Sequence, residues 1–256
     1  MLGIGETMSG WTLALCFVIG FIAQLIDGML GMAYGVCCNT FLRFALKMPA
    51  SVSSMLVHFS EILTTGASAV SHFCVGNVDK KVFLRILPPG IIGGLIGALL
   101  LSKLGEKLEG IISVYLVVMG VLLLAKVLLN KKPREYRSVY LTIIASIGGF
   151  SDATGGGGWG PIMTSSIIHT DKNPAKMIGT INTAEFFITL VESAVFTFSV
   201  QSVSQHWKEL LALMLGGVIA APLAARLCGK MNHRLLLILV GLLLIGLNLY
   251  KLIALF

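Results

Sequence analysis

Apolar stretches long enough to cross a membrane dominate the pattern of hydrophobic and polar positions along this chain. A helix needs about 20 consecutive apolar residues to cross a bilayer. Stretches close to that length lie at 82–102, 111–129, 207–225 and 235–255. Two longer and more polar stretches, at 50–75 and 175–200, also read as crossing helices. The pattern therefore predicts an all-α integral membrane protein.

Composition and charge support this class. Hydrophobic residues make up 56% of the chain and charged residues only 12%, whereas a soluble domain carries about 25% charged residues. A soluble helical bundle would show charged faces at helical period, which these segments lack. The net charge of +7 does not indicate nucleic-acid binding, because the lysines and arginines gather at the ends of the apolar stretches. We expect a multi-pass protein of the cytoplasmic membrane with the lipid bilayer as its partner.

The cysteines and the N-terminus add little chemistry. The five cysteines lack the paired spacing of a metal site or a disulfide framework, so we expect no metal and no cofactor. Residues 1–10 lack the basic start of a cleaved signal peptide. Nothing in the sequence assigns an oligomeric state.

A duplicated motif divides the chain into two halves. Asp27-x3-Gly31-x2-Tyr34-Gly35 reappears 125 positions later as Asp152-x3-Gly156-x2-Trp159-Gly160, and Pro49-Ala50 reappears as Pro174-Ala175 at the same offset. The glycine pairs Gly93-Gly94 and Gly216-Gly217 also correspond, and we interpret them as helix-packing positions. We predict two tandem repeats, 1–130 and 131–256, within one membrane domain. Internal repeats are typical of secondary transporters, whose sites lie where the repeats meet.

The orientation of the repeats depends on how the first apolar stretch of each half is folded. Residues 11–46 are too long for one crossing and are interrupted at Asp27–Gly35. If this stretch is a Gly-rich re-entrant hairpin followed by three crossings, the repeats are inverted and 13 of the 19 basic residues lie on one side. That side would be cytoplasmic by the positive-inside rule, with both termini outside. A kinked first helix that crosses once is the alternative, but it divides the basic residues almost evenly.

The two interrupted segments are the predicted binding site. Non-helical backbone at membrane depth is tolerated where it lies within protein or lines a cavity. The helix that follows each break presents free amides and a partial positive charge, which suit an anion. The substrate-binding candidates are Gly31, Tyr34, Gly35, Asn39, Thr40, Gly155, Gly156, Gly157, Gly158, Trp159, Gly160, Thr164, Ser165 and Asn182.

The duplicated motif, the Pro-Ala pair before the next helix and the overall length resemble the sulfite exporter TauE/SafE family of membrane transporters. The resemblance covers essentially the whole chain. It implies transport of small sulfur-containing anions such as sulfite and organosulfonates, with substrate contacts around 31–35 and 155–160. The first motif departs from the glycine-rich form, because Met32 and Ala33 stand where the second has Gly157 and Gly158. The two halves are therefore not expected to contribute equally.

Ionisable residues inside a membrane are costly and suggest function. His58 and Glu61 are three residues apart, hence on one helix face, and form the leading candidate for proton coupling. A structural hydrogen bond is the competing interpretation of this pair. Asp27 and Asp152 open the two motifs, and each either caps the turn that follows or binds a coupling proton. Glu185 is a further candidate, with Glu192 nearby.

The favoured function is a secondary transporter for a small anion, coupled to protons or to the membrane potential. A passive anion channel with the same fold is one alternative. A cation transporter with Asp27 and Asp152 at the site is another. An intramembrane enzyme is disfavoured, because His58-Phe-Ser-Glu61 is not a zinc-protease motif and Ser151 and Ser165 have no identifiable base.

Overall fold

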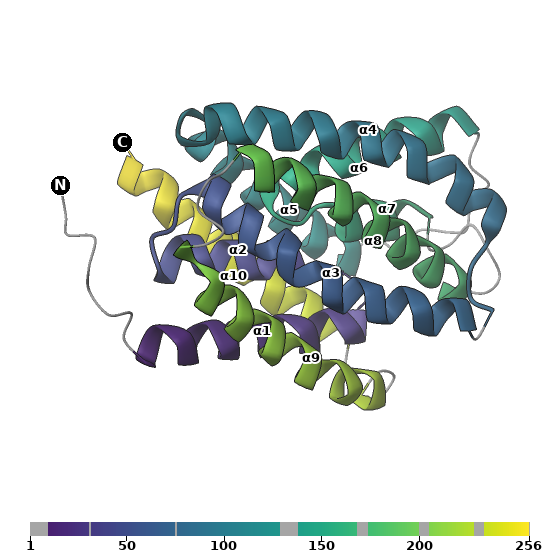
Figure 1. Cartoon of the computed structure of the whole chain (residues 1–256), viewed down its shortest axis with the longest axis horizontal. Coiled ribbons are helices and arrows are strands. Elements are labelled where there is room, and N and C mark those ends of the chain that lie inside the picture. The colour runs from purple at the N-terminus through teal and green to yellow at the C-terminus, as the bar shows by residue number, and fades with distance from the viewer. Residues whose placement is uncertain are drawn as a thin grey trace.

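The computed structural model describes residues 10–30, 32–74, 76–128, 138–167, 174–199, 205–227 and 233–255, and every element in these ranges is a helix. The first half contains α1 (Gly10–Leu30), α2 (Tyr34–Ala45), α3 (Ala50–Cys74), α4 (Lys80–Leu104), the short 3-10 helix η1 (Gly105–Leu108) and α5 (Glu109–Leu128). The second half contains α6 (Ser138–Gly155), α7 (Trp159–Ile167), α8 (Pro174–Ser199), α9 (Trp207–Leu227) and α10 (His233–Leu255). Figure 1 shows them as an elongated bundle.

The six crossing stretches expected from the sequence coincide with α3, α4, α5, α8, α9 and α10. By length and composition alone, three described helical segments can cross a membrane: Gly10–Asp27, Lys80–Leu104 and Lys176–Phe198. Large apolar side chains cover the outside of the bundle, among them Leu84, Ile111 and Phe198, the last of which is 88% exposed. Such a surface suits lipid rather than water.

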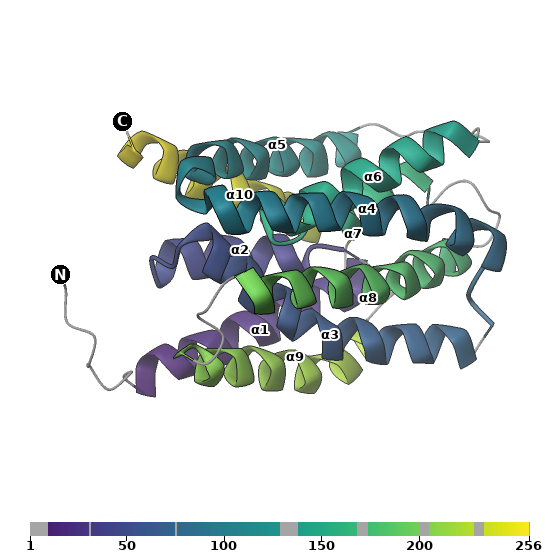
Figure 2. The same cartoon turned by 45° about the horizontal axis from the view of Figure 1, so that its top comes forward.

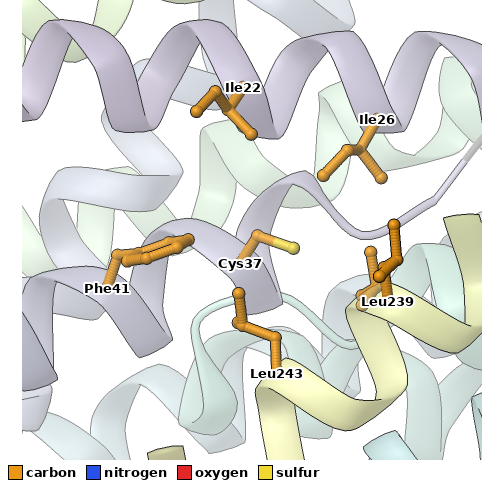
Figure 3. Close-up of a pocket in the computed structure, with 7 residues that line it drawn as sticks. Ile22, Ile26, Cys37, Phe41, Leu239 and Leu243 are labelled. Atoms are coloured by element: carbon orange, nitrogen blue, oxygen red, sulfur yellow. The ribbon is translucent and has the colours of Figure 1, made fainter.

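The first apolar stretch is broken and folds back on itself. α1 ends at Leu30, and α2 begins after Ala33, whose φ of 96° is left-handed. In Figure 3, α1 runs from Ile22 on the left to Ile26 on the right, whereas α2 runs from Cys37 towards Phe41 on the left, so the two helices run in opposite directions. Together with α10 they enclose an apolar cavity of about 90 Å³.

The second half repeats this arrangement. α6 ends at Gly155, and residues 156–158 form the break before α7. Gly148 of α6 lies against Trp159 and Met163 of α7, so α7 also turns back along the helix that precedes it.

The two halves pack through corresponding helices. α3 lies against α8 and α5 against α10, while α1 packs on α9 and α4 on α6. Gly93 of α4 faces the backbone of Ser146, and Gly216 of α9 faces the backbone of Phe17, which fits the packing role expected for these glycines. α1 begins and α10 ends at the same end of the bundle (Figures 1 and 2). The expected repeat boundary near residue 130 lies outside the described residues.

Candidate functional site

The two breaks meet backbone to backbone in the middle of the bundle. A Cβ built on Gly157 would overlap the backbone of Gly35 and Val36, and one on Gly35 would lie 2.5 Å from the Gly157 Cα. Gly157 also has a φ of 129°, which L side chains rarely adopt. Gly160 at the start of α7 faces Met32, so residues on both sides of each break contribute to this junction. We call it the tip junction, made by residues 32–35 and 155–160.

Polar side chains of the first half hold the second break in place. The amide of Asn39 in α2 donates to the Gly155 carbonyl, and the Asn39 oxygen accepts from the Ser53 hydroxyl at 2.7 Å. Ser54 of α3 donates to the Ala153 carbonyl at 2.6 Å. These bonds satisfy carbonyls at the end of α6 that have no partner within the helix. Asn39 therefore bridges the halves.

The two motif aspartates accept hydrogen bonds from the helices that follow them. Asp152 Oδ1 accepts from the amides of Gly158 at 2.6 Å and Trp159 at 2.9 Å, at the start of α7. Asp27 Oδ1 accepts from the Tyr34 amide at 3.2 Å, at the start of α2. This is capping geometry. The sequence predicted that backbone amides after each break bind an external anion. In the structure, these amides donate to the chain's own carboxylates instead.

A buried acidic cluster surrounds His58 beside the tip junction. His58 Nδ1 lies 3.3 Å from Glu61 Oε2 and 3.2 Å from Glu192 Oε2, and all three side chains are at most 3% exposed. The Asp152 carboxyl lies close enough to Glu192 for the two groups to interact electrostatically. Glu185 accepts from the Gly160 amide. We call these residues, with Asp27, the acidic cluster: Asp27, His58, Glu61, Asp152, Glu185 and Glu192.

The carboxyl groups of the acidic cluster lie too close together to carry negative charge without a neutralising partner. Five acids and one histidine lie together, and Asp152 Oδ2, Glu61 Oε2 and both Glu192 carboxyl oxygens accept no hydrogen bond. Two adjoining buried carboxyls are stable when they share a proton or hold a cation. Each of His58, Glu61 and Asp152 also offers one atom within 4.8 Å of the others, which is a separation that a single small cation can bridge. The cluster is therefore built to bind positive charge.

The two motif aromatics are turned into the helix packing. The Trp159 ring is fully buried against Gly90 and Gly148, and its indole N–H donates to the Ile181 carbonyl at 3.1 Å. The Tyr34 hydroxyl donates to Ser60 at 3.0 Å. Each ring therefore anchors the start of its short helix to the long helix beside it.

The remaining candidates are divided between the junction and other places. Thr40 and Thr164 are buried in the short helices, and Thr40 accepts from Asn248 of α10 at 3.3 Å. Asn182 lies away from the junction on the α3–α8 interface, where it donates to Ser68 at 3.0 Å. Gly31 and the Ser165 side chain lie outside the described residues.

Glu192 and Tyr115 were missed as site residues. Glu192 follows Glu185 by seven positions, so the helical period places both on one face of α8, and that signal was available. Tyr115 of α5 packs its ring on Gly155 and its hydroxyl on Gly158. Tyr115 lies in an apolar helix, and nothing in the sequence around it indicated a place beside the second break. Arg43 is a buried basic residue at the end of α2, where it donates to Ser113 at 3.2 Å.

Comparison with known proteins places the chain in a family. The family model of the sulfite exporter TauE/SafE matches residues 16–250. The chain belongs to the TauE/SafE family. It is also 42% identical over 234 residues to the probable membrane transporter protein YtnM of Bacillus subtilis (strain 168), covering 87% of this chain and 77% of that protein. No solved structure matches. The resemblance seen in the sequence is confirmed, and the chain is a multi-pass membrane transporter of the cell membrane.

Proposed function

We propose that this TauE/SafE protein moves a small sulfur-containing oxyanion, sulfite or an organosulfonate, together with protons through the tip junction. The observation that carries the proposal is the contact between two helix breaks beside a cluster of six ionisable groups, four of which are buried. Broken helices that meet inside a membrane bundle are typical sites of secondary transporters. Membership of the sulfite exporter family supports the substrate class, and the acidic cluster supports the coupling.

We further propose that the halves are inverted repeats and that each pair of short helices re-enters on one face. The antiparallel courses of α1 with α2 and of α6 with α7 support this arrangement. The end of α3 and the starts of α4 and α8 share one end of the bundle (Figure 2). Lys80, Lys81 and Lys176 lie at that end, which makes it the cytoplasmic face by the positive-inside rule.

In the proposed coupling, the aspartate carboxylates and the substrate oxyanion compete for the same backbone amides. While Asp152 is ionised, it occupies the Gly158 and Trp159 amides and repels an anion. A protonated Asp152 is a weaker acceptor, so an oxyanion replaces it on those amides. Asp27 and the Tyr34 amide act in the same way at the first break. Anion binding thus requires proton uptake by the cluster.

The test is flux in proteoliposomes loaded with sulfite or a small organosulfonate under an imposed or collapsed pH gradient. Wild-type flux should saturate and follow the gradient. Asp152→Asn keeps an acceptor for the two amides but removes the titrating proton, so flux should persist without pH dependence. Proton and anion affinities should be coupled by about tenfold or more in the wild type, within the usual range for linked sites. Flux that ignores the gradient in the wild type contradicts the coupling.

The chain offers a matched control for the histidine. His206 and Glu209 form a second His–Glu pair at three-residue spacing, 3.0 Å apart at the start of α9. His58→Ala should abolish the pH dependence of flux, because His58 belongs to the acidic cluster that binds the coupling proton. His206→Ala should retain that pH dependence. Equal effects of both changes would remove His58 from the mechanism.

A cation transporter is the second candidate, because the carboxylates do gather at one site. The same proteoliposomes distinguish it. Saturable cation flux without anion flux from correctly inserted protein would favour this candidate, and non-saturating anion flux would indicate a channel.

A further inference from the structure

A stripe of polar residues runs along one face of α3. They recur at alternating spacings of three and four positions, which places them on one helix face: His58, Glu61, Thr65, Ser68 and His72. Side chains between them, such as Leu63 and Val70, are more than half exposed on the lipid-facing side. The stripe is longer than the cluster needs, because only His58 and Glu61 belong to the cluster.

A matching stripe on α8 faces the first one. Its residues follow the same spacing: Asn182, Glu185, Thr189 and Glu192. The helices run antiparallel, since His58 meets Glu192, Ser68 meets Asn182 and His72 meets Gly179. We call the nine side chains of these two stripes the polar seam.

Burial changes along the seam. At its inner end His58, Thr189 and Glu192 are fully buried, and the Thr189 hydroxyl makes no hydrogen bond. Towards its outer end Ser68, His72 and Asn182 are half-buried. The buried His72 Nδ1 likewise has no partner. Polar atoms in this state are the usual partners of buried water.

The seam ends at a polar contact between the α3–α4 turn and α8. Lys176 pairs with Asp79 at 3.2 Å, and the Asp79 amide donates to Thr180 at 2.8 Å. Asp79 and Lys176 are both partly exposed, so this end of the seam reaches the surface of the bundle.

We propose that the polar seam is a water-filled half-channel that carries protons from the Asp79–Lys176 face to the acidic cluster. That transport uses these protons rests on the proposed function. That water reaches the seam does not depend on it. A lipid-facing interface would not need polar residues at every turn of two facing helices, because unpaired polar groups in hydrocarbon are costly. The seam also gives the cluster access from one membrane face only.

Thiol labelling tests the half-channel without any substrate. Ser68→Cys and Asn182→Cys are made singly, treated in sided membrane vesicles with a membrane-impermeant thiosulfonate reagent, and mapped by peptide mass spectrometry. Both new thiols should react from the face that labels the exposed native Cys74, while the buried Cys37 and Cys38 stay unmodified. Leu63→Cys is the matched control, since it lies on α3 but faces lipid, where a thiol does not ionise. Labelling of Ser68→Cys and Asn182→Cys no faster than Leu63→Cys overturns the proposal.

Filling the seam tests its use by protons. Ser68→Leu should lower proton-driven flux by about tenfold or more while sulfite binding to detergent-solubilised protein is kept. Ser68→Thr retains a hydroxyl and should restore flux. A Ser68→Leu variant with wild-type melting temperature and undiminished flux would contradict the proton route. If the seam cysteines are labelled but the protein moves no anion, the half-channel is supported and the proposed function is refuted.

Discussion

At the scale of single residues, the site depends on positions where a side chain has no room. Gly157 combines a left-handed backbone with direct contact to Gly35 of the other half, so two separate constraints exclude a Cβ. Gly160 is less restricted, because a Cβ there would lie 3.3 Å from the Met32 Cα. Glycines of the same motif therefore differ in how strictly they exclude a side chain.

Gly157→Ala should destabilise the protein by about 1–3 kcal/mol or more, through backbone strain and overlap with Gly35. Gly246→Ala is the control, because that glycine of α10 has nothing within 4 Å of an added Cβ. It should be neutral or stabilise the fold by up to about 1 kcal/mol. Thermal unfolding in detergent measures both. A Gly157→Ala protein as stable as Gly246→Ala would mean that the two breaks do not touch.

At the scale of elements, Asp79 links three helices. It caps α4 by accepting from the amides of Lys81 at 2.9 Å and Val82 at 3.1 Å, and it pairs with Lys176 of α8. The hydrogen bond from Val82, with further contributions from Lys176 and Lys81, holds the pKa of this carboxyl below its ordinary value. The turn that follows α3 is thereby fixed to the start of α8.

Asp79→Asn keeps a hydrogen-bond acceptor at the start of α4 but removes the charge that pairs with Lys176, so it should cost about 0.3–1 kcal/mol at neutral pH. Because the folded-state pKa is depressed, the ionised carboxylate stabilises the fold above its unfolded pKa of about 3.9, and that contribution is lost as pH falls through the folded value. Melting temperatures of wild type and variant should therefore differ at pH 7 and converge towards pH 3. A difference that is independent of pH would assign the effect to packing alone.

At the scale of the whole molecule, the two halves have the same order of elements and pack through corresponding helices. α1 begins and α10 ends at one end of the bundle, opposite Lys80, Lys81 and Lys176 (Figure 1). In the proposed topology, with re-entrant hairpins and six crossings, both termini lie on the same face. The tip junction and the acidic cluster then sit between the faces, as alternating access requires.

Reporter fusions at the N-terminus and after Phe256 should both report the outer face, whereas a reporter inserted after Gly76 should report the cytoplasm. The physical reason is the positive-inside rule acting on the basic residues beside that turn. A terminus on each face would contradict the hairpins and require a single crossing in one half only.

The sequence by itself determined the class, the six long apolar helices and the two breaks, because these depend on local properties. Hydrophobic length specifies a membrane helix, and a glycine-rich interruption with an aspartate specifies where the helix ends. The pairing of His58 with Glu61 followed from helical period in the same way.

Only the tertiary structure decided which segments meet. It brought Gly35 to Gly157, set Glu192 beside His58, placed Tyr115 against the second break and moved Asn182 from the junction to the polar seam. These contacts join residues more than 40 positions apart, and no local periodicity encodes them. They are set by how two halves of similar apolar helices pack, where close backbone approach at glycines and the neutralisation of buried carboxyls select one arrangement.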